Sequence, residues 1–178
     1  MTNKMYLIAK QIKLIDWGMV FLGAKGLPSG KLSASDVSDF ACQKLANSDE
    51  VRGELLTAIS EVAFCTDITE EIIDYLYSIC QQKRIDVNVS YRKWRFLSLN
   101  NLMTELPDDC VYGLLKLNEF WMVWGESVGC PNIAQGVGND ISPAEYYTDE
   151  QFSLTVKRHQ EWLKKEGEKL IKMHNNIL

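Results

Sequence analysis

The stretch from Pro107 to Gly125 constrains the fold more than any other part of the sequence. It opens with a proline and two aspartates, which suit the first turn of a helix because proline lacks an N–H and the helix dipole favours negative charge there. It closes at Gly125, a residue typical of helix C-termini. Its apolar side chains leave no wide polar face: Val111, Tyr112, Leu114, Leu115, Leu117, Phe120, Trp121, Met122, Val123 and Trp124. Such a helix has to be wrapped by other elements, so the stretch predicts a buried central helix roughly 25 Å long.

Helical spacing of apolar residues recurs before this stretch. Ser33 with Asp36 three residues later resembles a capping box, Ser48 is an expected helix cap, and Asp67 or Thr69 is expected to start a further helix. The spacing predicts helices over 5–14, from 16 to either 23 or 26, and over 33–45, 48–63 and 67–80.

The segment from Lys83 to Ser90 allows two interpretations. Ile85, Val87 and Val89 alternate with polar residues as in an edge strand. A single strand is marginal without a partner. We therefore favour an extended linker into a helix that Ser90 caps, with Trp94 and Leu97 turned inward.

The last fifty residues divide into a loop and a helix. Residues 125–148 are rich in glycine and proline, and a loop of this length in a compact domain is usually functional or mobile. Thr148 and Gln151 form a capping-box pattern that starts a long C-terminal helix over 149–174. The sequence thus predicts an all-α single domain over 1–178, a bundle of about seven or eight helices around the central helix 107–125.

Composition excludes several classes of protein. No apolar run approaches the ~20 residues of a membrane span. The N-terminus lacks a long apolar region and a cleavage site, so we expect a mature, cytoplasmic protein. The net charge of −5 argues against direct nucleic-acid binding. The five cysteines are scattered, which argues against a zinc site or a disulfide framework, and we expect no cofactor.

The sequence contains no convincing catalytic group. His159 and His174 are its only histidines, and both lie in the predicted C-terminal helix. The Gly136-Val137-Gly138 segment lacks the lysine and the Ser or Thr of a phosphate-binding loop. Paired carboxylates such as Asp108 with Asp109 have a structural reason at helix starts. We therefore expect a protein that is not an enzyme.

Charge is distributed unevenly. Residues 36–74 contain ten acids and two bases, while the balancing positive charge lies elsewhere, much of it in the C-terminal helix. Solvated helix faces are one explanation. The other is an acidic surface that steers and holds a basic protein. Candidate partner-binding residues are four acids, Asp67, Glu70, Glu71 and Asp74, and three loop residues, Asn132, Asp140 and Tyr146.

Several segments carry a family resemblance: Ile15-Asp16-Trp17-Gly18, Gly26-Leu27, the run from Leu32 to Ala41, and Lys93-Trp94. Over roughly its first hundred residues the chain resembles a family of small bacterial helical proteins catalogued as a domain of unknown function. Some relatives in that family are immunity proteins of contact-dependent growth inhibition. The resemblance implies a helical fold and an inhibitory role, and it supplies no site residues.

Three functions follow as hypotheses. The first is an immunity protein that covers the active site of a cognate toxin domain, a basic nuclease. The second is a helical regulator that binds a small ligand, with Trp121 and Trp124 lining a cavity. The third is an enzyme that works through paired carboxylates and a metal.

Overall fold

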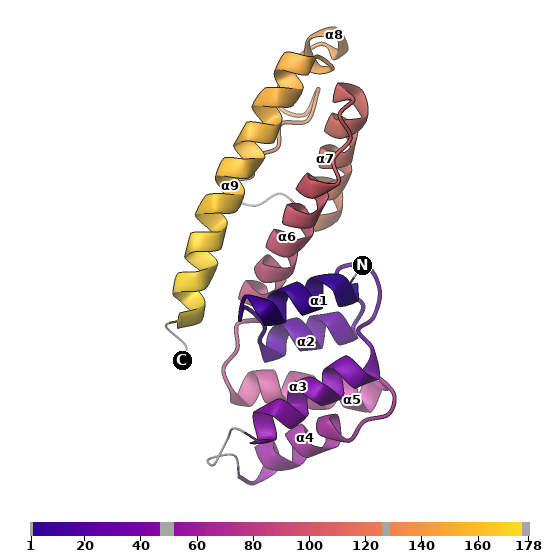
Figure 1. The fold of residues 1–178 in the computed structure, drawn as a ribbon, viewed down its shortest axis with the longest axis vertical. Helices are drawn as coiled ribbons and strands as arrows, with labels where there is room; N and C mark the ends of the chain where they lie inside the picture. Colours follow the sequence, from indigo (N-terminus) through magenta and orange to yellow (C-terminus); the bar gives the residue numbers. More distant parts are fainter. Residues whose placement is uncertain (1, 47–51, 126–128, 176–178) are drawn as a thin grey trace. The chain divides into compact units, whose positions relative to one another are not determined.

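The computed structural model describes residues 2–46, 52–125 and 129–175, and every regular element within these ranges is a helix (Figure 1). The predicted all-α class is confirmed. Contacts divide the chain into two compact units, residues 1–97 and residues 98–178, which are described separately. The prediction of a single domain stays a prediction. The described helices are α1 (Thr2–Gln11), α2 (Trp17–Ala24), α3 (Ala34–Ala46), α4 (Glu54–Ala63), α5 (Glu70–Gln82), α6 (Val87–Thr104), α7 (Cys110–Trp124), α8 (Pro143–Tyr146) and α9 (Asp149–Asn175).

The first unit contains α1 to α5 and the first half of α6. Helix α4 packs against both α3 and α5, and α2 packs against α5. The fully buried side chains of this unit include Met19, Val37, Ile59, Leu76 and Trp94.

Two predicted helix starts in this unit are confirmed. Ser33 Oγ accepts the N–H of Asp36 at 3.1 Å just before α3. Thr69 is the N-cap of α5 and accepts the N–H of Ile72 at 3.3 Å. Ser48, the cap expected before α4, lies outside the described residues.

Helix α6 starts earlier than predicted. Val87 and Val89 are helical, so both the edge strand and the linker reaching Ser90 are wrong. Asp86 explains the early start, because its carboxylate accepts the N–H of Asn88 at 2.9 Å at the head of the helix. Ser90 lies one turn inside α6, where it is fully buried and does not cap the helix.

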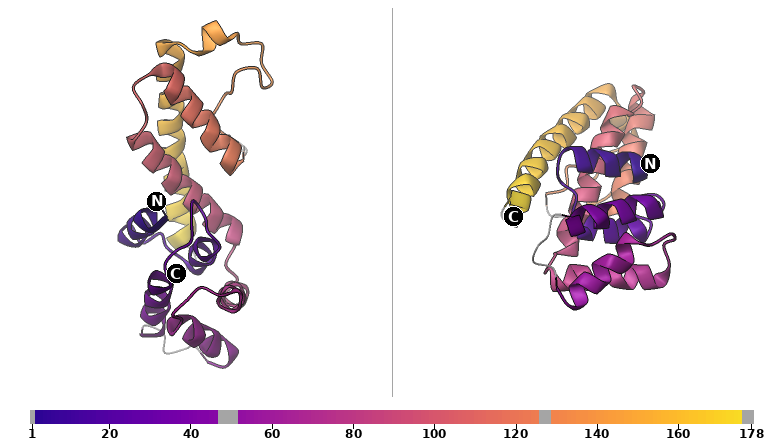
Figure 2. Two further views of the ribbon diagram at one scale, coloured as in Figure 1. Left: turned by 90° about the vertical axis from the view of Figure 1, so that its right-hand side faces the viewer. Right: turned by 60° about the horizontal axis from the view of Figure 1, so that its bottom comes forward.

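The second unit pairs α7 with the long helix α9 (Figure 2). Asp109 caps α7 by accepting the N–H of Tyr112 at 3.0 Å, and Gly125 ends it with a φ of 74°. Gly113 allows close packing, since a Cβ there would lie 2.7 Å from Cζ of Phe152 on α9.

The expectation that this central helix is enclosed on all sides is wrong. One face of α7 is buried, through residues such as Leu117 and Trp121. The opposite face leaves Tyr112 66%, Met122 84% and Val123 76% exposed. One long neighbouring helix covers one face of α7, so an apolar sequence by itself does not establish burial on all sides.

The loop before α9 contains a short helix that the sequence patterns did not reveal. Ser142 and Glu145 form a capping box around α8, with Pro143 at its first position. Thr148 Oγ1 then accepts the N–H of Gln151 at 3.2 Å, and the predicted C-terminal helix is confirmed as α9.

Candidate partner-binding surfaces

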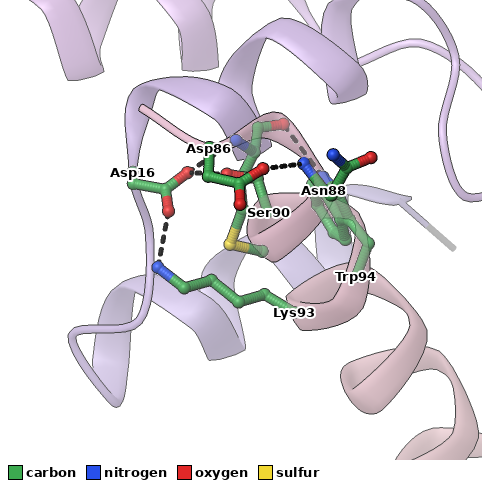
Figure 3. A network of polar contacts seen from close by, with 7 residues as sticks. Asp16, Asp86, Asn88, Ser90, Lys93 and Trp94 are labelled. Carbon is green, nitrogen blue, oxygen red and sulfur yellow. Dashed lines mark hydrogen bonds and ion pairs between the residues drawn. The ribbon is translucent and has the colours of Figure 1, made fainter. Parts of the chain in front are cut away.

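A buried polar network joins the start of α2 to α6 (Figure 3). Asp16 is the N-cap of α2 and accepts the N–H of Met19 at 2.7 Å. The same carboxylate accepts the Ser90 hydroxyl at 2.8 Å and pairs with Lys93 Nζ at 2.5 Å. Trp94 Nε1 donates to the Met19 carbonyl at 2.9 Å.

Backbone proximity makes this network possible. Gly18 lies so close to α6 that a Cβ there would be 2.8 Å from Cβ of Ser90. Ser90 is fully buried and the Lys93 side chain is 1% exposed, so a substrate cannot reach either group. The network therefore holds two helices together.

The four predicted acids lie together on the outside of the first unit. Asp67 precedes α5, Glu70 and Glu71 occupy its first turn, and Asp74 follows one turn later. All four are exposed, because the opposite face of α5 carries the buried residues Ile72, Ile73, Leu76, Ile79 and Cys80. Among the described residues, none of the four carboxylates forms an ion pair with a lysine or arginine. This acidic surface is therefore not neutralised within the described part of the chain.

Neighbouring titratable groups respond to this negative charge. The pKa of Tyr75 is raised by desolvation and by the carboxylates of Glu71 and Glu61, the latter on α4. The pKa of the Cys65 thiol is raised by burial, with a further contribution from Asp67. Two helices and their connection thus contribute to one negative field.

The three predicted loop residues are divided between surface and interior. Asp140 is exposed. Tyr146 is fully buried, its pKa is raised by that burial, and its hydroxyl donates to Asn118 Oδ1 at 3.2 Å. Asn132 is partly buried and its Nδ2 donates to the same Asn118 oxygen at 3.0 Å. Tyr146 therefore supports the loop from inside and does not lie on the surface that a partner would meet.

Asn139 gives the glycine-rich turn its shape. Its side-chain nitrogen donates to the carbonyls of Ala134 and Val137, and its oxygen accepts the N–H of Gly136 and of Ile141. The amide of Asn139 thus forms hydrogen bonds with backbone groups on both sides of the turn.

A cavity of about 560 Å³ separates α7 from this loop. Trp121 lines it, as the ligand-binding hypothesis expected, and Trp124 does not. Asn118 and Gln135 also line it, and sequence reasoning missed both. A signal for Asn118 existed, since it lies four residues after Leu114 and three before Trp121, on the buried stripe of a helix.

His159 lies in the interior of the second unit. His159 is fully buried, its Nε2 accepts the indole N–H of Trp121 at 2.9 Å, and its Nδ1 lies 2.7 Å from the Thr155 carbonyl. Burial lowers its pKa, so the neutral ring is favoured. The side chain of His174 lies outside the described residues.

The described ranges contain neither a cluster of metal-binding side chains nor a helix that could span a membrane. No group of three or more His, Cys, Asp or Glu side chains there is placed to hold a metal ion. No helix there combines the length and apolar character needed to cross a bilayer.

Comparison with known proteins identifies the family of the chain but no individual relative. No curated protein and no solved structure matches the chain. One family model matches residues 6–167, so the likeness extends well beyond the first hundred residues and includes the loop and most of α9. The chain therefore belongs to the DUF2247 family, described as an uncharacterized protein conserved in bacteria.

Proposed function

We propose that this protein is an immunity protein that binds the toxic domain of a contact-dependent growth inhibition effector and covers its active site. The observation that carries the proposal is the exposed acidic surface at the start of α5 and just before it, whose four carboxylates form no ion pair with a basic residue among those described. The immunity role that the sequence resemblance implies for the N-terminal segments is the second ground for this proposal.

The chemistry of the surface indicates the kind of toxin. A nuclease holds its phosphate-rich substrate with lysine and arginine side chains. Asp67, Glu70, Glu71 and Asp74 would pair with those cations and repel nucleic acid itself. An exposed acidic field also accelerates encounter with a basic protein by about 10- to 1000-fold, which suits an inhibitor that has to act before damage accumulates.

A structural explanation accounts for only part of the acidic surface. Glu70 and Glu71 stabilise the first turn of α5 through the helix dipole, by about 0.3–1 kcal/mol each. Asp74 lies a turn further along the helix, where this effect has faded. Helix stability therefore does not account for the charge of Asp74 beside the other three, and a basic partner would pair with it.

The loop adds a second contact region in this proposal. Asp140 is exposed on the turn that Asn139 organises, so it is held in a defined place. Specificity for one toxin would come from matching charges and from conflict with non-cognate toxins.

Co-expression tests the function directly. The effector domain encoded immediately upstream is induced in cells with and without this protein, and we expect survival only when the protein is present. Equal killing in both cultures rejects the proposal.

A charge-reversal variant tests the surface. Replacing Glu70, Glu71 and Asp74 by lysine should slow association with the toxin by at least about tenfold at low salt and should reduce its salt dependence. The matched control reverses three exposed acids on α9 instead, Glu150, Glu161 and Glu168. If both triple variants slow association equally, net charge explains the effect and the α5 surface is not the binding site.

A further inference from the structure

The exposed side of α7 carries more large apolar side chains than the exposed side of any other helix in the described ranges. A single exposed apolar side chain is ordinary, whereas a contiguous group on one side of a helix indicates an interaction surface. We call this surface the α7 face. It consists of five exposed apolar residues and two exposed charged residues between them: Val111, Tyr112, Leu115, Lys116, Glu119, Met122 and Val123.

Four residues of the α7 face have the same spacing in both directions along the helix. Tyr112, Lys116, Glu119 and Val123 are separated by four, three and four positions, which keeps them on one side of the helix. A second copy of the helix that runs in the opposite direction therefore presents the same positions in reverse order. Lys116 then lies opposite the partner's Glu119, and Tyr112 lies opposite the partner's Val123. One register thus matches opposite charges in the middle and apolar side chains at both ends.

The two charged residues select the antiparallel direction. Within one copy, Lys116 Nζ lies 2.8 Å from Glu119 Oε2, and the two side chains are 54% and 64% exposed, so each still has room for a second partner. Antiparallel helices add two reciprocal pairs between Lys116 and Glu119, which gives four charges of alternating sign. Parallel helices would bring Lys116 against Lys116 and Glu119 against Glu119, and like charges repel. A second copy supplies the complementary charges in the required order, because it carries the same sequence.

We propose that two copies of this chain associate through the α7 face, with their α7 helices antiparallel about a two-fold axis. The axis makes every contact occur twice. Burial of the apolar residues at both ends supplies the driving force, and the central charges set the direction and register. An interface of one helix from each copy is small, so we expect a Kd of about 1 to 100 µM. The α7 face lies in the second unit, and this proposal does not depend on the proposed immunity function.

Charge reversal in the middle of the α7 face tests the register. Sedimentation equilibrium of the full chain measures the Kd of the dimer, in about 50 mM salt so that exposed charges are little screened. Lys116→Glu and Glu119→Lys each turn two attractive pairs into two repulsive pairs, and each should weaken the dimer about tenfold or more. The two variants shift the net charge in opposite directions, so a general charge effect would not weaken both. Lys165→Glu and Glu161→Lys make the same changes at exposed positions of α9 and should leave the Kd unchanged.

A mixture of the two α7 variants tests the antiparallel pairing directly. A copy with Lys116→Glu carries two negative charges at these positions, and a copy with Glu119→Lys carries two positive charges. A dimer of one copy of each has opposite charges at both crossings, so it should form with about the wild-type Kd. Native mass spectrometry with one variant labelled with ¹⁵N should show mostly the mixed dimer.

An apolar substitution tests the ends of the α7 face. Val123→Ser removes the contact with the partner's Tyr112 at both ends of the dimer and should weaken it about tenfold or more. Phe64→Ser is the matched control, because Phe64 is 81% exposed in the first unit, close to the 76% of Val123, and its loss should leave the Kd unchanged. Both residues are exposed, so neither substitution opens a cavity in a core.

Three results would overturn the proposal. The first is a wild-type chain that stays monomeric up to about 300 µM, above the Kd expected for an interface of this size; the α7 face would then serve another partner. The second is a dimer that both charge variants and Val123→Ser leave intact, since another surface would then hold it. The third is a mixture of the two charge variants that forms no more mixed dimer than chance pairing gives. None of these measurements uses a toxin, so their failure is separate from failure of the immunity function.

Discussion

Asp16 provides the sharpest test of how the first unit is held together. Replacing Asp16 by asparagine keeps an oxygen that can cap α2 and accept the Ser90 hydroxyl, since asparagine caps helices about as well as aspartate. The substitution removes the negative charge beside Lys93, whose side chain is 1% exposed. Asp16→Asn therefore isolates the contribution of the buried charge pair.

The expected loss in the free energy of unfolding follows from the burial of the Asp16–Lys93 ion pair. Removing one partner of a buried ion pair costs about 3–5 kcal/mol, and the 15% exposure of Asp16 places this pair at the lower end, about 3 kcal/mol. Lys93→Met should cost less, about 2 kcal/mol, because Asp16 then keeps the N–H of Met19 and the Ser90 hydroxyl. The double variant has no unpaired charge and should lie within about 1 kcal/mol of wild type.

Urea unfolding followed by circular dichroism measures all three variants. The midpoint should fall for each single variant with the slope m unchanged, and the double variant should recover most of the loss. The reasoning is refuted if Asp16→Asn unfolds within about 1 kcal/mol of wild type. It is also refuted if the two single losses simply add in the double variant, since the two side chains would then be uncoupled.

Three further predictions concern other positions. Burial lowers the pKa of His159, so as the pH falls the unfolded chain takes up a proton at this side chain before the folded chain does. The free energy of unfolding should therefore decrease below about pH 6.5, by up to about 1.4 kcal/mol per pH unit. The decrease should stop below the pKa of His159 in the folded protein. In urea unfolding between about pH 7 and pH 5, the stability advantage of wild type over His159→Gln should shrink, and a constant advantage would contradict this. Gly113→Ala should destabilise the second unit by about 1 kcal/mol, because crowding against Phe152 outweighs the gain in helix propensity; a higher midpoint in urea would contradict it. Thr69→Ala should cost about 1 kcal/mol by removing the cap of α5, while Thr69→Ser should cost little; equal losses in thermal unfolding would show that the hydroxyl cap is not responsible.

Local signals predicted the helices well. Ser33, Thr69 and Thr148 each precede a helix, as expected, and accept a backbone N–H in its first turn. Asp109 was expected inside the first turn of a helix starting at Pro107, and it is instead the N-cap of α7, which starts at Cys110. Capping is encoded within three or four residues, so it can be derived from sequence. The predicted start of α6 was wrong because it followed the alternation of apolar residues from Ile85 to Val89. The carboxylate of Asp86 accepts the N–H of Asn88 and starts the helix there.

Features that depend on distant neighbours were not predictable in this way. An apolar helix such as α7 shows that burial is needed somewhere, but only the packed structure shows that Met122 and Val123 lie on an exposed face. The donor–acceptor pair of Asn118 and Asn132 spans fourteen positions and depends on a loop path that no local pattern specifies. The acidic residues were predictable as a surface, because charged side chains without a reason for burial lie outside.

The polar network at Asp16 has a consequence for how this family can diversify. Residues 16–19 form hydrogen bonds and an ion pair with residues 90–94 there. The part of the chain between them that contains α3, α4 and α5 is therefore an excursion whose two ends this network joins, and the network is its base. The acidic surface lies entirely within this excursion, away from the closing residues. If the proposed immunity function holds, exchanging residues 33–82 between two relatives should therefore transfer the part of toxin preference that the acidic surface sets, while the base stays intact.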